Sequence, residues 1–302
     1  QNIETANIHE FKMPRYFAIF INQDQNEALE SRQVREALSL ATNRKQIIEG
    51  VLDGYGQYAG TPIPPNLKEY YNKGVEIIDY NPQKARQLLE EAGWTDNNGD
   101  GILDKVIEIE NEEEEESEEN EEQEAVEKTI EYRNLSFTLI TAQRPELEEV
   151  ANLIKEQWRQ VGITLNIKTE DLGELQQGAI RSRSYELLMF GEILGVIPDP
   201  FSFWHSSQIN DPGLNLANYE DSEVDELLEE ARQETDEEER IQKLMEFQAN
   251  VMTDIPAIFL YDPVYIYPVN KSIQGIKPGL IVDSSYRFID IENWYIATKR
   301  VF

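Results

Sequence analysis

The order of apolar patterns between residues 135 and 190 restricts the fold more than any other feature of the sequence. Residues 135–142 form a short apolar run typical of a strand, and residues 145–161 carry an amphipathic helical stripe that Gly162 closes. Residues 163–167 alternate as a second strand, and residues 185–190 form a third. Strands that alternate with helices in this way predict an α/β fold.

Capping residues mark the beginnings of the other helices. Ser31 and Asn43 are candidate N-caps for two successive helices, and Pro82 occupies the first turn of a third. Two acidic helices are predicted next, the first with Val224, Leu227, Leu228 and Ala231 on one face and the second capped by Asp236. The strand patterns that remain are, in order, 16–21, 257–261 and 264–269.

An acidic segment interrupts these patterns. Residues 108–127 consist mostly of glutamate with serine, asparagine and glutamine. Like charges at this density repel one another and offer little apolar surface to bury. We therefore predict a disordered acidic insertion on a surface loop.

The composition excludes several classes of function. The formal net charge is −32, and such a field repels phosphate backbones and anionic lipids, so we expect no nucleic-acid partner. The chain has no cysteine, which excludes thiolate metal sites and cysteine nucleophiles. No stretch reaches the roughly twenty apolar residues that span a bilayer. The first residues do not resemble a secretory signal, so we expect that a signal was removed or that the chain is part of a longer protein.

Several segments, in a fixed order, resemble the family 5 extracellular solute-binding proteins, which are the peptide and nickel receptors of ABC importers. The similarity covers essentially the whole chain outside the acidic insertion. The segments are 31–44 (SRQVREALSLATNR), 54–59 (GYGQYA), 80–94 (YNPQKARQLLEEAGW), 96–101 (DNNGDG), 160–163 (QVGI), 198–204 (PDPFSFW) and 218–228 (NYEDSEVDELL).

The resemblance implies the C-terminal lobe of a two-lobed periplasmic-binding-protein fold of the type II-like kind. Residues 22–262 would form the solute-binding lobe, and residues 1–21 and 263–302 would belong to the hinge and the first lobe. The rest of the N-terminal lobe and a signal or lipoprotein anchor would precede this chain. The implied protein is an extracytoplasmic monomer, not an enzyme, that delivers short peptides or related solutes to the transmembrane subunits of an ABC permease.

The segment 190–204 is the best candidate for ligand contact. It leaves an apolar strand and enters a loop rich in glycine, proline and aromatic residues, which suits the mouth of a crevice. In peptide-binding relatives this strand exit pairs with the main chain of an extended ligand. Where some relatives place an aspartate for the ligand's amino group, this chain has Leu194 or a neighbour, and only Glu192 offers a nearby charge. The predicted ligand-binding residues are Asn22, Glu192, Gly195, Asp199, Phe201 and Trp204, and Trp204 fits a core position equally well.

A calcium-type loop follows the third helix. Asp96, Asn98, Asp100 and Asp104 have the spacing of oxygen ligands around a hard cation, and calcium is the only cofactor that the sequence suggests. The twelfth position is Ile107 where such loops carry a bidentate glutamate. A plain turn stabilised by aspartate and asparagine side chains is the alternative.

Two other classes of function stay open at the level of sequence. One is a ligand sensor or chaperone-like binding module with the same fold and no transport. The other is a hydrolase on an α/β scaffold, for which no acid–base or nucleophile pattern stands out. Arg35 and Arg44 match family positions, and we predict that they form structural ion pairs with acidic neighbours.

Overall fold

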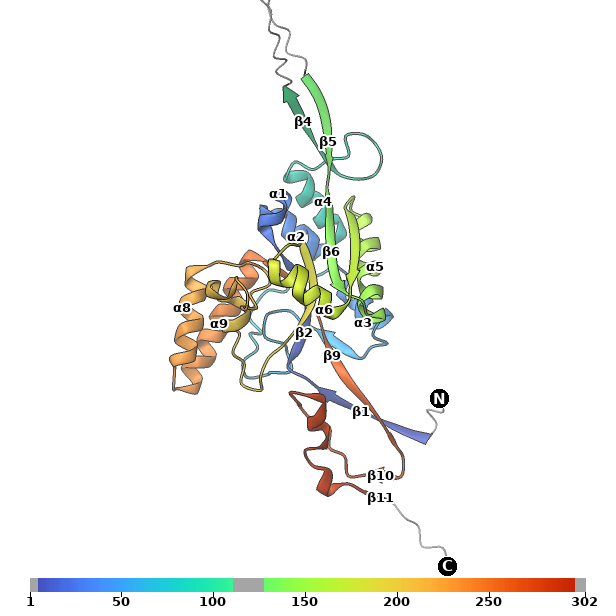
Figure 1. Ribbon diagram of the computed structural model, residues 1–302, viewed down its shortest axis with the longest axis vertical. Coiled ribbons are helices and arrows are strands. Elements are labelled where there is room, and N and C mark those ends of the chain that lie inside the picture. Colours follow the sequence, from blue (N-terminus) through green and yellow to red (C-terminus); the bar gives the residue numbers. More distant parts are fainter. Residues whose placement is uncertain (1–4, 111–127, 297–302) are drawn as a thin grey trace, which may run out of the picture.

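The computed structural model describes residues 5–110 and 128–296 and shows an elongated molecule around a central α/β body (Figure 1). Seven strands form one sheet in the order β1-β9-β2-β8-β6-β7, with β3 paired to β9. The neighbours of β6 run parallel to it, whereas β8–β2, β2–β9 and β9–β1 are antiparallel. The strands are β1 (Ala6–Lys12), β2 (Arg15–Ile21), β3 (Gly56–Tyr58), β6 (Ser136–Ala142), β7 (Thr164–Glu170), β8 (Leu187–Ile193) and β9 (Ala257–Asn270).

Helices cover the sheet, and two smaller β structures project from the body. The hairpin of β4 (Asp104–Glu110) and β5 (Lys128–Asn134) extends from one end of the molecule. At the other end, β1 and the second half of β9 lead to the small sheet of β10 (Ile273–Gln274) and β11 (Tyr295–Ile296). The helices are α1 (Glu27–Glu30), α2 (Arg32–Leu40), α3 (Arg44–Gly50), α4 (Pro82–Glu91), α5 (Pro145–Arg159), α6 (Leu172–Leu175), α7 (Phe201–Trp204), α8 (Ser222–Gln233) and α9 (Glu237–Asp254). None of the helices that the structure describes is both long and apolar enough to cross a membrane.

The predicted alternation of strands and helices is confirmed. β6, α5 and β7 form a parallel unit within residues 136–170, where the apolar patterns place it. The Asn43 and Asp236 side chains cap α3 and α9 by accepting main-chain N–H groups. Ser31 precedes α2, but its side chain makes no capping hydrogen bond, so that part of the prediction is wrong.

The structure corrects one strand prediction and the start of the predicted acidic insertion. Residues 257–261 and 264–269 are not two short strands, because β9 continues unbroken through Asp262 and Pro263. Pro263 is tolerated because it lies at the point where the pairing partner of β9 changes from β2 to β1. It lies opposite Gly56, the first residue of the three-residue strand β3. Residues 108–110, assigned above to the acidic insertion, extend β4 and pair with β5. The rest of that predicted insertion, residues 111–127, lies outside the described residues.

Trp204 organises the aromatic part of the core. Its side chain is fully buried, and its ring lies 5.9 Å from Phe259, 6.2 Å from Phe20, 6.3 Å from Tyr219 and 6.5 Å from Phe247 between centroids. Rings at these distances bury large apolar areas and add a small favourable term through their geometry. One short helix, α7, is thereby fixed against β2, β9 and α9.

The prediction that Arg35 and Arg44 form ion pairs is wrong. Arg35 donates to the carbonyl oxygens of Leu29, Glu30 and Asp254, and Arg44 donates to main-chain carbonyls that include Phe259 at 2.7 Å. Both side chains are buried. A guanidinium has five donors in a fixed fork, so it can satisfy several carbonyls at helix and strand ends where a single carboxylate could not.

We predict that Arg44→Met lowers the free energy of unfolding by about 3 kcal/mol, because it removes the guanidinium donor from the carbonyl oxygens of Ser39, Thr42 and Ile78. Urea denaturation followed by circular dichroism measures the change. The matched control is Lys45→Met, whose side chain is 80% exposed and which should change stability by less than about 0.5 kcal/mol. Equal losses in the two variants would contradict a structural role for Arg44.

Candidate functional site

The second half of β8 has a strand partner on one side only. β6 pairs with residues 187–189, whereas β2 pairs with β8 as far as Ile193. The amide of Leu194 donates to the Pro14 carbonyl oxygen at 2.6 Å, and hydrogen bonds alternate along an antiparallel ladder. Gly191 and Ile193 therefore direct their main-chain N–H and C=O groups away from β2. We refer to these groups of Gly191 and Ile193 as the free edge of β8.

Five residues share one face of the sheet beside this edge. We refer to them as the site face, and they are Arg15, Phe17, Gly191, Ile193 and Tyr261. Arg15 lies opposite Ile193, and Phe17 lies opposite Gly191. The ring of Tyr261 stacks on Phe17 with a centroid separation of 5.1 Å and an interplanar angle of 23°. A Cβ atom on Gly191 would lie 2.9 Å from the Phe17 ring, so close packing requires glycine here.

The first turn of α5 approaches the site face. Glu146 of this turn is exposed, and it accepts a hydrogen bond of 3.4 Å from the Tyr261 hydroxyl. Because α5 directly follows β6, its N-terminus lies at the carboxyl end of the parallel part of the sheet, where α/β folds usually bind ligands. A free strand edge, an aromatic face and a helix N-terminus therefore meet at one end of the body.

Glu192 points to the opposite face of the sheet. It is 2% exposed and accepts a hydrogen bond from the Tyr16 hydroxyl, which in turn accepts one from Trp204 Nε1 at 3.3 Å. Burial raises the pKa of Glu192 well above its usual range, against the opposing effect of the Tyr16 hydrogen bond. The shift favours the neutral form of the carboxyl group, which faces the core. Glu192 is unsuited to neutralise a ligand's amino group from this position.

We predict that Glu192→Gln weakens the pH dependence of stability. A raised folded pKa stabilises the protein fully below the ordinary glutamate pKa of about 4.3, and this contribution is lost as the pH rises toward the folded value. Glutamine is neutral at every pH, so the variant should lose less unfolding free energy between about pH 5 and about pH 8. Urea titrations of both proteins at the two pH values measure this loss of unfolding free energy. An equal loss in the two proteins would show that Glu192 is charged when folded.

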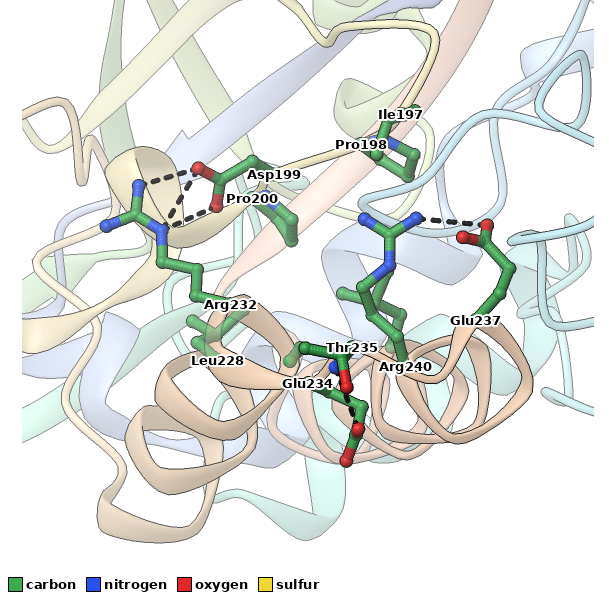
Figure 2. A pocket seen from close by; sticks show the side chains of 12 residues that line it. Ile197, Pro198, Asp199, Pro200, Leu228, Arg232, Glu234, Thr235, Glu237 and Arg240 are labelled. Carbon is green, nitrogen blue, oxygen red and sulfur yellow. Dashed lines mark hydrogen bonds and ion pairs between the residues drawn. The ribbon is translucent and has the colours of Figure 1, made fainter.

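A hollow opens next to the strand exit, between the loop 197–200 and the turn that joins α8 to α9 (Figure 2). Its volume is about 360 Å³, and Leu228, Ala231 and Leu244 provide an apolar floor. Arg232 and Arg240 stand at its rim, each bound to a carboxylate. The remaining lining residues include Ile197, Pro198, Asp199, Pro200, Glu234, Thr235 and Glu237.

Asp199 and Phe201 both hold Arg232. The Asp199 carboxylate accepts from Arg232 Nη2 at 2.6 Å and from Nε at 2.9 Å, and the guanidinium lies 3.8 Å from the Phe201 ring centroid. Phe201 stacks on His205 at 4.1 Å. Asp199 is half exposed at the rim of the hollow. Its carboxylate is already paired with Arg232, so a ligand that contacts Asp199 would also contact this ion pair.

The structure separates Asn22 and Trp204 from the other predicted site residues. Asn22 ends β2 at the side remote from Arg15 and is fully buried, where it donates to the Arg183 carbonyl oxygen at 2.8 Å. Trp204 belongs to the core described above. Gly195 is exposed in the loop after β8, where a Cβ would lie 2.9 Å from the Ile197 carbonyl oxygen. Of the predicted set, Gly195 and Asp199 lie on the accessible loop, and Phe201 packs behind Arg232.

The family model for bacterial extracellular solute-binding proteins, family 5 (middle region), matches residues 1–213. The chain belongs to this family. The oligopeptide-binding protein AppA of Bacillus subtilis is 30% identical over 278 residues, which make up 91% of this chain and 46% of AppA. The dipeptide-binding protein of Escherichia coli is 25% identical over 89% of this chain and 44% of its own length.

Solved structures of family 5 proteins confirm the predicted fold class. The structure of Bacillus subtilis AppA in complex with a nonapeptide matches 97% of this chain and 53% of its own with a TM-score of 0.76 at 29% identity. Campylobacter jejuni NikZ in complex with Ni(L-His) has the same TM-score at 24% identity and covers 97% of this chain and 54% of its own. This family 5 chain therefore spans about half the length of the relatives it matches.

Asp262 is a feature of this family 5 chain that the sequence patterns did not reveal. It lies where β9 passes from β2 to β1, is 3% exposed, and accepts hydrogen bonds from Gln57 at 2.6 Å and Asn66 at 2.8 Å. Burial raises its pKa to about 7, against the opposing effects of the Gln57 hydrogen bond and the Arg15 and Lys12 charges. The sequence feature that could have drawn attention to this residue is an aspartate followed by a proline between two apolar strand patterns.

We predict that Asp262→Asn removes a fall in stability with rising pH. With a folded pKa of about 7 and an ordinary value near 3.8, Asp262 stabilises the fold below about pH 4 and loses up to about 4 kcal/mol of that contribution as the pH passes 7. Asparagine can still accept both amide hydrogen bonds. Thermal unfolding between about pH 4 and about pH 8 measures the change, and an unaltered pH profile would contradict the raised pKa.

The calcium-type loop uses its oxygen atoms internally. Asp96 accepts from the amides of Gly99 and Gly101, and Asp100 accepts from the amide of Ile102. Asp104 is buried and accepts from the amide and side chain of Asn97, while Asn98 accepts from the amide of Asp100. Within residues 5–110 and 128–296 no group of three or more His, Cys, Asp and Glu side chains is arranged to hold a metal ion. The geometry fits the alternative of an aspartate-rich turn.

Proposed function

We propose that this chain forms the second lobe of a peptide receptor for an ABC importer, and that the free edge of β8 binds the main chain of an extended peptide. The observation that carries the proposal is the position of Gly191 and Ile193, whose N–H and C=O groups face away from β2 beyond the last residue that β6 pairs. Main-chain pairing recognises peptides of many sequences, because it leaves side chains out of the contact. The names of the relatives AppA and dipeptide-binding protein agree with this ligand class.

The division of the chain into lobes is part of the same proposal. Residues 22–262 would form most of the solute-binding lobe, to which β2 adds a central strand, while the rest of residues 1–21 and residues 263–302 would continue into the hinge and the first lobe. Exposed apolar side chains in the C-terminal segment support an incomplete lobe, since Ile289 is 71% exposed and Ile296 is 67% exposed. A preceding half of comparable size would cover them, and the two lobes would close on the solute as a population shift. We further propose that the complete protein is a lipid-anchored, monomeric, extracytoplasmic receptor that docks on the permease.

Native mass spectrometry on the two-lobe protein, meaning this chain expressed with its proposed preceding half, tests the ligand class. A series of added masses that fit short peptides, absent from the denatured spectrum, is the result expected for a main-chain receptor. A single discrete adduct would indicate a specialised solute. A protein that stays empty in the presence of peptide mixtures would contradict the peptide proposal.

We predict that Ile193→Pro in the two-lobe protein weakens peptide binding about 5- to 10-fold, because proline removes one N–H from the free edge. The unfolding temperature should change little, since this N–H is not directed at β2. Ile193→Ala is the matched control, because it removes the side chain and keeps the N–H. Isothermal titration with tri-alanine measures both variants, and equal affinities would show that the free edge does not bind the ligand.

A further inference from the structure

One face of the β4–β5 hairpin contacts the body of the lobe. Lys105 and Arg133 are cross-strand partners on this face. The Lys105 Nζ atom lies 4.7 Å from the centroid of the Trp94 ring, and Arg133 forms an ion pair with Glu27 at 3.1 Å. These contacts hold the base of the hairpin, because they join its two strands to α1 and to the segment that follows α4.

The opposite face of the hairpin is apolar and exposed. Side chains alternate between the two faces of a strand, so Val106, its partner Tyr132 and the nearby Ile130 all project from this face, which we call the outer face. Val106 is 47% exposed, Tyr132 is 46% exposed and Ile130 is 57% exposed. Three large apolar side chains together on a projecting hairpin form an exposed patch of the kind that marks an interaction site.

The outer edges of the hairpin are open as well. Among residues 5–110 and 128–296, β4 and β5 pair only with each other, apart from one bridge between Asp104 and Thr95 at the base. Unpaired main-chain groups along such an edge can pair with an additional strand, and a two-stranded hairpin gains stability when a third strand is added. The outer face and an open edge are therefore accessible to the same extended segment.

Position and charge restrict what covers the outer face. The proposed first lobe would leave it uncovered, because β1, β10 and β11 of the segments that would continue into that lobe lie at the end of the molecule opposite the hairpin (Figure 1). The net charge of −32 disfavours a second copy of the chain. Residues 111–127, which join β4 to β5, add to this effect, since they contain eleven glutamates and no basic residue. The same charge repels anionic lipid and attracts a basic partner.

We propose that the β4–β5 hairpin binds an extended segment of a partner protein in which a short apolar run is flanked by lysines or arginines. The apolar run packs beside Val106, Ile130 and Tyr132 and pairs with an open edge, and the basic flanks lie in the negative field of the chain. This interaction goes beyond the solute-binding function and does not depend on it, because the hairpin and the free edge of β8 belong to different sheets.

Two peptides of equal charge, with blocked termini, test the proposal in the two-lobe protein. The probe has three lysines on each side of a valine-tyrosine-valine centre, and the control peptide has threonine-serine-threonine at its centre. At about 0.15 M salt, which partly screens charge attraction, we expect the probe to bind about 10- to 100-fold more tightly, because its centre buries apolar area on the outer face. Equal affinities in isothermal titration would show that charge alone attracts both peptides and would overturn the proposal.

Substitutions on the outer face distinguish this site from others on the protein. Ile130→Thr and Tyr132→Thr keep a side chain that suits a strand, and each should reduce the ratio of the two affinities about 3- to 10-fold. The control is Leu214→Thr, at a 43% exposed position outside the hairpin, which should leave the ratio unchanged. Unchanged thermal unfolding shows that the variants fold. A ratio that survives both hairpin substitutions contradicts the proposal.

Hydrogen exchange locates the contact independently of the solute. The probe should slow amide exchange in residues 104–110 and 128–134, and the control peptide should not. Protection confined to other segments would contradict the proposal. If the hairpin is protected but the protein binds no tri-alanine, the hairpin proposal stands and the peptide function fails.

Sedimentation velocity tests whether a second copy occupies the outer face. We expect the two-lobe protein to sediment as a monomer, because its charge opposes self-association. Self-association that Tyr132→Thr abolishes would show that a second copy binds there, and would overturn the proposal of a basic partner.

Discussion

The antiparallel pairing of β2 with β8 on one side and β9 on the other is the constraint on which the rest of the structure depends. Side chains alternate between the two faces of a strand, so one register decides both faces at once. One face carries Tyr16 against Trp204 in the core, and the other carries Arg15 and Phe17 at the site. A shift of one residue would exchange the two sets and place a charge in the aromatic core.

The change from parallel to antiparallel pairing at β8 creates the site. β6 leaves the sheet to begin α5 after pairing with residues 187–189, while β8 continues along β2 to Ile193. The unequal lengths expose main-chain groups that neither neighbouring strand can satisfy. A folded protein ordinarily pairs such groups, and an edge left open beside a helix N-terminus suits a ligand that supplies its own main chain.

Charge burial in this lobe follows the availability of partners. Glu192 and Asp262 are buried beside neutral donors, and both have raised pKa values because the charged form loses its hydration. Arg44 keeps its charge in a buried place because carbonyl dipoles surround it. Arg15 lacks such a shell among the residues that the structure describes. The buried acids make stability depend on pH, because protonation removes the cost of burying their charge.

The sequence by itself determined the elements and the family. Periodicity located β6, α5 and β7, capping side chains located α3 and α9, and ordered motifs predicted the family that the comparisons confirmed. Those signals are local, because they depend on neighbours within a helical turn or a strand. The partners of side chains and strand edges depend on residues far apart in sequence, so only the tertiary structure turned Glu192 inward and opened the edge at Gly191. For the same reason only the structure showed that Arg15 Nε has no partner among the described residues and that β9 runs unbroken through Pro263.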